Sequence, residues 1–103
     1  MVSREIVEGE QVQGVDEKIT YSLTTTPWGT SPSAIAVKAY DVTLSYTDVT
    51  ATVMPVGVGS AVADVITLPE LTALTESHLY RIEVKFVAQG NTFEAFFIVR
   101  AMR

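Results

Sequence analysis

Two stretches near the end of the chain, 80–87 and 93–101, have an apolar residue at every second position, and this alternation constrains the fold more than any other feature. The alternate apolar positions are Tyr80, Ile82, Val84 and Phe86 in the first stretch and Phe93, Ala95, Phe97, Val99 and Ala101 in the second. A period of two is typical of a β-strand with one buried face. The sequence therefore predicts a final antiparallel hairpin whose two strands bury the same face.

The dipeptide Gly90-Asn91 predicts a two-residue turn between these strands, with Gln89 paired to Thr92. The facing core pairs are then Phe86 with Ala95, Val84 with Phe97 and Ile82 with Val99. A slip of one residue would expose all of these side chains, so the buried face is strongly specified.

The remaining chain alternates short strand patterns with turn signals. Residues 1–17 are polar and are expected to form an N-terminal arm or an edge strand, and residues 18–103 to form a single β-sandwich domain. The expected strands are about 18–26, 34–40, 48–54 and 62–68, with a turn at 27–32, a flexible loop at 55–60 and a crossover at 71–77. This spacing predicts an all-β protein, either an antiparallel β-sandwich of about seven strands or a small barrel.

The segment from Leu74 to Tyr80 favours one kind of sandwich. A Leu six residues before a Tyr that opens the penultimate strand resembles the tyrosine corner of immunoglobulin-like and fibronectin III-like domains. The Tyr80 hydroxyl is expected to hydrogen-bond to upstream backbone. The chain has neither Gly nor Pro inside the corner, where those domains usually have one.

Charge and composition exclude several classes of function. The chain of 103 residues has a net charge of −5 and scattered basic residues, so no nucleic-acid partner is expected. It contains no cysteine, and no apolar run approaches the roughly 20 residues of a membrane-spanning helix. We therefore expect no membrane partner. The charged start lacks the apolar stretch of a signal peptide, which indicates synthesis in the cytoplasm.

No set of residues predicts catalysis. His78 is the only histidine, and its polar surroundings indicate a surface position. Asp41, Asp48 and Asp64 lie too far apart in the sequence for a calcium loop and are interpreted as solvated acids at strand ends. Residues 57–59, Gly-Val-Gly, do not lead into a helix and are interpreted as loop. We expect no enzyme activity, no metal and no cofactor.

Two groups of residues are candidates for binding. Phe96 and Ile98 fall on the outward face of the last strand, opposite Lys85 and Glu83 in the predicted register. Neighbouring charged side chains could shield them, or they could form a subunit contact.

The second candidate group is Trp28 with Tyr40 and Tyr46, aromatics that could stack on sugar rings. A Trp between Pro27 and Gly29 could equally cap the core.

Several short motifs together resemble one family. They are Thr26-Pro27-Trp28-Gly29, Tyr40-Asp41-Val42-Thr43, Asp48-Val49-Thr50, Ile66-Thr67-Leu68-Pro69, Leu74-Thr75, Tyr80-Arg81-Ile82-Glu83-Val84 and Gly90-Asn91-Thr92-Phe93-Glu94-Ala95. Over about residues 19–101 the chain resembles small immunoglobulin-like proteins encoded in bacteriophage and prophage structural-gene clusters.

The resemblance implies a non-enzymatic component of the virion head, connector or tail. Such a protein would be assembled in the bacterial cytoplasm, then held in the virion by contacts with itself, as a homo-oligomer, or with other virion proteins. The alternative hypothesis is a carbohydrate-binding or adhesive β-sandwich module that uses Trp28, Tyr40 and Tyr46.

Overall fold

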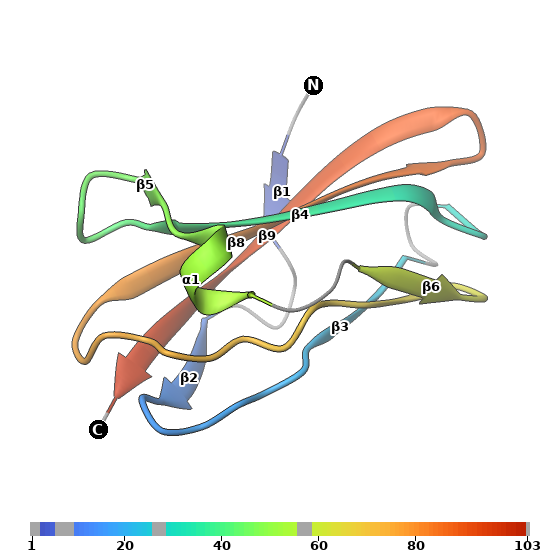
Figure 1. The fold of residues 1–103 in the computed structure, drawn as a ribbon. Helices are drawn as coiled ribbons and strands as arrows, with labels where there is room; N and C mark the ends of the chain where they lie inside the picture. The colour runs from blue at the N-terminus through green and yellow to red at the C-terminus, as the bar shows by residue number, and fades with distance from the viewer. Residues whose placement is uncertain (1–2, 6–9, 26–28, 56–58, 103) are drawn as a thin grey trace.

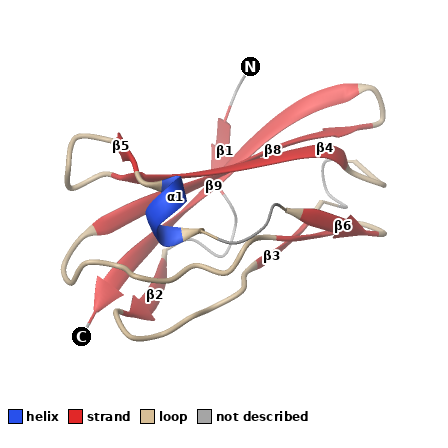
Figure 2. Ribbon diagram, viewed as in Figure 1, coloured by secondary structure: helices blue, strands red, loops and turns tan. Residues whose placement is uncertain are grey.

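Two β-sheets face each other across a shared core in the computed structural model, which describes residues 3–5, 10–25, 29–55 and 59–102 (Figure 1). The larger sheet contains β1 (Ser3–Glu5), β2 (Gln11–Gly14), β4 (Ser33–Asp41), β5 (Thr47–Asp48), β8 (Leu79–Ala88) and β9 (Asn91–Met102). The smaller sheet contains β3 (Ser22–Thr24), β6 (Ser60–Val62) and β7 (Val65–Thr67). One helical turn, α1 (Thr50–Val53), lies between β5 and β6 (Figure 2). The prediction of an all-β protein is confirmed.

The order of the strands defines the two layers. The larger sheet runs β1-β9-β8-β4-β5, with β2 also beside β9, and the smaller sheet runs β3-β7-β6. β1 and β2 pair with β9 in parallel, whereas the other neighbours are antiparallel. The described residues form nine strands rather than the predicted seven, because several of them are only two to four residues long.

The buried core draws on both layers. Its side chains are Leu23 and Ile66 from the smaller sheet, Ala39, Tyr80, Ile82, Val84, Phe86, Ala88, Ala95, Phe97, Val99 and Ala101 from the larger sheet, and Val53, Met54, Leu68, Leu71 and Leu74 from the connections. Every alternate position predicted for the final hairpin belongs to this set except Phe93, which is half-buried and stacks on Phe86 with ring centroids 5.6 Å apart. The predicted buried face is therefore confirmed.

The register of that hairpin differs from the prediction by two residues. The turn consists of Gln89 and Gly90, and Ala88 pairs with Asn91. The core pairs are Phe86 with Phe93, Val84 with Ala95, Ile82 with Phe97 and Tyr80 with Val99. Both turn residues have positive φ, 51° and 79°, which is the backbone of the type I′ turn that fits the twist of a hairpin. Glycine takes such a φ readily, and a two-residue shift keeps every side chain on its predicted face.

Two predicted strands are wrong in detail. Residues 48–54 form the end of β5 and α1, because Asp48 Oδ1 accepts hydrogen bonds from Thr50 N and Thr50 Oγ1 at 3.0 and 2.7 Å. An Asp side chain bonded two residues ahead favours a helical start over an extended strand. Residues 62–68 are divided by a turn at Ala63, where φ is 52°, so they contribute to both β6 and β7.

The N-terminal region lies against the edge of the larger sheet. β2 pairs with β9, and Val15 N donates to Met102 O at 2.8 Å. Gln13 is fully buried: its Nε2 donates to Leu71 O at 2.8 Å and to Glu17 O at 3.0 Å. This amide thereby connects the strand beside β9 to the segment that follows the smaller sheet.

Asp48 makes the start of α1 sensitive to pH. Hydrogen bonds from Thr50 lower the pKa of Asp48 below its ordinary value of 3.8, and Lys38 adds a smaller effect. A depressed folded-state pKa contributes stability above the ordinary pKa that is lost as the pH falls through the folded-state value. We expect Asp48→Ala to lower the free energy of unfolding by about 0.5–1 kcal/mol at neutral pH, and by less at acidic pH, where the carboxylate becomes protonated in the folded state as well.

Urea unfolding at the two pH values measures this difference. Asp48→Asn is the control, because it keeps an acceptor oxygen for Thr50 N but carries no charge. A loss of stability in Asp48→Ala that is equal at both pH values would contradict the assignment.

Candidate functional site

The outward face of the larger sheet carries the two predicted contact residues, Phe96 and Ile98. Both lie on β9 and are half-buried. In the observed register Phe96 lies opposite Glu83 and Ile98 opposite Arg81, instead of the predicted Lys85 and Glu83. The shift follows from the position of the turn.

Arg81 covers Phe96. Its guanidinium carbon lies 3.8 Å from the centre of the Phe96 ring, and its Nε donates to Glu83 Oε2 at 2.7 Å. A guanidinium over an aromatic face is a favourable cation–π contact, and the carboxylate holds the cation in place. Arg81 therefore lies over Phe96 in the way that one of the two sequence alternatives, shielding by a charged neighbour, predicts.

The apolar surface of β9 continues to the end of the strand and on to β2. Val12 lies beside Arg100 and is 60% exposed, and Met102 is 47% exposed. Arg100 Nε donates to Glu10 Oε2 at 3.0 Å, so its charge is paired at the sheet edge. We call Val12, Phe96, Ile98 and Met102 the outer band.

The sequence reasoning missed Val12 and Met102. Met102 lies four residues after Ile98, so the alternation of the strand places both side chains on the same outward face. The strand pattern could therefore have identified Met102. Val12 belongs to the outer band because β2 pairs with β9 in parallel, and a pairing between such distant segments cannot be predicted from a local sequence pattern.

The predicted tyrosine corner is a contact between Tyr80 and the backbone. Tyr80 is buried, and Thr75 N donates a hydrogen bond to its hydroxyl at 2.7 Å. Leu74, the residue before Thr75 in the chain, is buried in the core. The bond closes the connection that leads from the smaller sheet into β8.

The prediction that His78 is a surface histidine is wrong. Its Nδ1 lies 2.7 Å from Asp41 Oδ2, and the Asp41 side chain is only 3% exposed. Asp41 Oδ1 also accepts a hydrogen bond from Leu44 N at 3.2 Å. Asp41 and His78 join the end of β4 to the corner before β8, and Asp41 is therefore not a solvated acid.

The other two predicted solvated acids also bind backbone. Asp48 holds the start of α1, and Asp64 Oδ1 accepts a hydrogen bond from Ser31 N at 3.1 Å. In the described part of the chain, no three His, Asp or Glu side chains are close enough to hold a metal ion.

Of the three candidate sugar-stacking residues, Tyr40 and Tyr46 lie in the part of the chain that the structure describes. Trp28 lies outside the described residues. Its neighbour Gly29 packs against Ala88, beside the turn between β8 and β9. Tyr46 is 57% exposed in the turn at the opposite end of β4, and Tyr40 is half-buried on that strand. The structure therefore places the two tyrosines of this group, on β4 and in the turn that follows it.

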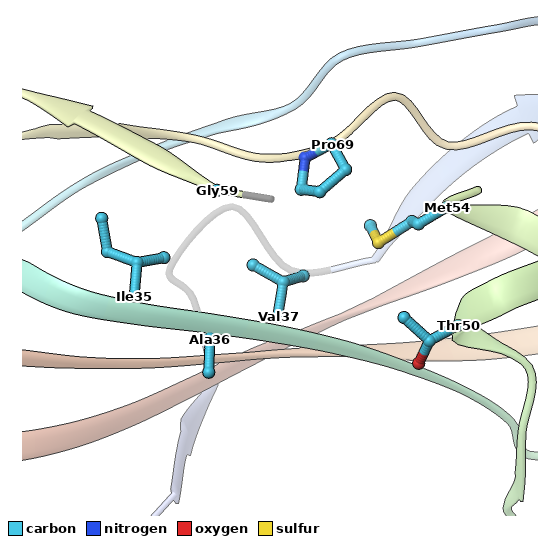
Figure 3. Close-up of a pocket in the computed structure, with 7 residues that line it drawn as sticks. All are labelled: Ile35, Ala36, Val37, Thr50, Met54, Gly59 and Pro69. Carbon is cyan, nitrogen blue, oxygen red and sulfur yellow. The ribbon is translucent and has the colours of Figure 1, made fainter. Parts of the chain in front are cut away.

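One pocket of about 340 Å³ lies between the sheets at the side of β4. It is lined by Ile35, Ala36, Val37, Thr50, Met54, Gly59 and Pro69. Figure 3 shows Ile35 and Val37 pointing from β4 toward Gly59 and Pro69, while Ala36 points away. A Cβ on Gly59 would lie 2.7 Å from Ile35 Cγ2, so glycine permits this close approach. None of the seven lining residues is charged.

Of the predicted loop at 55–60, residues 56–58 lie outside the described residues.

No helix in the described ranges is both long and apolar enough to cross a membrane. No family model matches the sequence, and no match is found among curated proteins or among solved structures.

Proposed function

We propose that this chain is an immunoglobulin-like structural protein of a bacteriophage or prophage particle, and that it acts by non-covalent contact rather than by catalysis. The observation that carries the contact role is the outer band on β2 and β9. The assignment to a virus particle rests on the sequence motifs described above.

The strand order supports an immunoglobulin-like fold. In the variable-type arrangement, strands G, F, C and C′ share one sheet and strands B, E and D lie in the other. The order β9-β8-β4-β5 corresponds to the first set, and the order β3-β7-β6 corresponds to the second. The corner at Tyr80 lies between the strands that correspond to E and F, where such domains have it. β1 and β2 depart from the constant-type arrangement, because they lie beside β9 rather than beside β3.

The composition of the outer band supports protein contact. Val12 and Met102 expose 60% and 47% of their surface on a sheet whose other outward residues are mostly polar. Arg81 stacked on Phe96 adds a fixed guanidinium beside an aromatic ring. Arginine, methionine and aromatic residues are enriched at protein interfaces, and a cation already held by Glu83 loses little freedom on binding.

A rigid sheet face of this kind suits a particle. Capsids and tails repeat each contact by symmetry, so the many weak contacts between copies together hold a stable assembly.

Particle incorporation tests the proposal. In a prophage-carrying strain from which the gene has been deleted, we expect the wild-type chain, supplied in trans, to be found in purified particles by mass spectrometry. Val12→Glu combined with Ile98→Glu should reduce incorporation at least about tenfold, because it places charge in a desolvated contact.

Thr52→Glu, on the exposed surface of α1, is the matched control and should be incorporated normally. Thermal unfolding of each purified variant shows whether it folds. Particles that form without the chain and never contain it would contradict the proposed function.

A further inference from the structure

One edge of the smaller sheet runs along residues 19–25, the segment that contains β3. Ile19 exchanges backbone hydrogen bonds with Leu71, and Tyr21 O accepts a hydrogen bond from Leu68 N at 2.9 Å. The odd-numbered residues of the segment therefore bond to the strand beside it. Because successive residues of an antiparallel strand alternate their direction, the backbone N–H and C=O groups of the even-numbered residues point away from the sheet. These residues are Thr20, Ser22 and Thr24.

The outward groups of these three residues form no hydrogen bond with another described residue. The strand order β3-β7-β6 places β3 at the border of the sheet, and Figure 1 shows it at the border of the fold. Residues 19–25 include no charged residue and no proline, two features with which natural proteins block a sheet edge. We call these three residues, with their outward backbone groups, the β3 edge.

The spacing of these groups determines which kind of molecule can bond to all of them. A donor and an acceptor at every second residue of an extended strand match the backbone of another extended strand. Pairing within the smaller sheet is antiparallel throughout, and antiparallel pairs are slightly more stable than parallel ones. The occupant that fits the β3 edge is therefore an antiparallel strand.

The inward side chains of the segment restrict the sequence of such a strand. Ile19 and Tyr21 lie on the same face of the strand as Leu23, but they are half-buried whereas Leu23 is buried. Tyr21 packs against the core and lies 5.3 Å from Phe97 between ring centroids. An added strand with apolar side chains on this face would cover the exposed parts of Ile19 and Tyr21.

The charges beside the β3 edge favour a basic partner over a second copy. Residues 16–25 and 64–71 contain Lys18 as their one basic residue. Near the start of the segment they also carry three exposed acids, Asp16, Glu17 and Glu70. A second copy would bring the same acids and a net charge of −5, whereas a lysine or arginine of another protein would lie among opposite charges.

We propose that the β3 edge accepts an extended segment of a different protein as an additional antiparallel strand. This segment has apolar side chains at every second position and a basic residue at its C-terminal end, which lies beside the acids. Main-chain hydrogen bonds supply the affinity, and the apolar and basic side chains supply the selectivity. The β3 edge belongs to the smaller sheet and the outer band to the larger one, so this inference does not rest on the proposed function.

Nuclear magnetic resonance of the isotope-labelled full chain, titrated with a synthetic peptide, tests the inference. The probe is a peptide of about seven residues in which threonine and valine alternate before a C-terminal lysine. The amide signals of Thr20, Ser22 and Thr24 should shift to saturation with a dissociation constant of about 0.1–1 mM, because a few exposed backbone hydrogen bonds stabilise a complex weakly. Hydrogen exchange at the three amides should become slower.

Ser22→Pro removes the central outward N–H and no hydrogen bond of the sheet, because proline is tolerated on an edge strand whose N–H faces solvent. It should weaken peptide binding at least about tenfold while the domain still folds, as thermal unfolding will show. Ser22→Thr is the matched control: it changes the side chain, keeps the N–H, and should bind the peptide as the wild type does.

Methylated peptides test the same hydrogen bonds on the wild type, so the inference does not depend on Ser22→Pro folding. In an antiparallel pair the threonine N–H groups of the peptide point to the β3 edge and the valine N–H groups point away. N-methylation of the threonines should abolish binding, and N-methylation of the valines should not.

Three results would overturn the inference. The first is the absence of shifts at the three amides up to about 5 mM peptide. The second is equal binding of the peptide methylated at its threonines and the peptide methylated at its valines. The third is a shift of the same amides when the chain is concentrated without peptide, which would identify a second copy as the occupant. Binding is measured on the purified chain, so its failure is distinct from a failure of particle incorporation.

Discussion

Replacing His78 with alanine is expected to lower the free energy of unfolding by about 3 kcal/mol. The reason is the environment of Asp41, whose side chain is 3% exposed and whose Oδ2 lies 2.7 Å from His78 Nδ1. Without the imidazole, the hydrogen bond from Leu44 N at 3.2 Å is the one that the buried carboxylate keeps among the described residues. A buried charged group that loses its partner is strongly destabilising. Urea unfolding monitored by circular dichroism measures the effect.

A second substitution separates this cause from a loss of packing. In the double variant His78→Ala with Asp41→Asn, the buried group is neutral, so the double variant should be more stable than His78→Ala alone. A double variant that is less stable than His78→Ala would show that the imidazole stabilises the fold through packing and not through Asp41.

Replacing Gln13 with leucine is expected to cost about 2 kcal/mol. Gln13 is fully buried, donates to Leu71 O and Glu17 O, and accepts a hydrogen bond from the Tyr21 hydroxyl at 3.0 Å. Leucine has a similar volume but satisfies none of these groups. The Tyr21 hydroxyl and Glu17 O would then lose a buried partner, and β2 would lose its connection to the segment at Leu71.

The control is Gln11→Leu, a half-buried position two residues earlier on the same strand, where we expect a change within about 0.5 kcal/mol. Hydrogen exchange adds a local readout: Val15 N, which donates to Met102 O, should exchange faster in Gln13→Leu. Equal stability of the two variants would mean that the amide of Gln13 does not hold β2 in place.

The alternation of residues 80–87 and 93–101 determined which face of the final hairpin is buried. A period of two allows only registers of one parity to bury all the apolar residues, and the structure has that parity. The alternation could not choose between registers that differ by two residues. That choice depended on Gln89 taking a positive φ before Gly90, which is a property of the closed turn.

Other segments show where local pattern is insufficient. Residues 48–54 alternate like a strand, yet the Asp48 side chain starts a helical turn that buries Val53 and Met54. Residues 62–68 have the pattern of one strand, but the turn at Ala63 divides them into β6 and β7 and places Val62 opposite Val65.

The candidate sites depend on partners that are distant in the sequence. Asp41 and His78 are 37 residues apart and meet because β4 pairs with β8, with Asp41 opposite Tyr80. Val12 enters the outer band because β2 pairs with β9 across almost the whole length of the chain. Side-chain alternation is a local property of the backbone, so the sequence determined which residues face inward. Which strands become neighbours depends on how the sheets pack, and only the tertiary structure decided which outward residues share a surface.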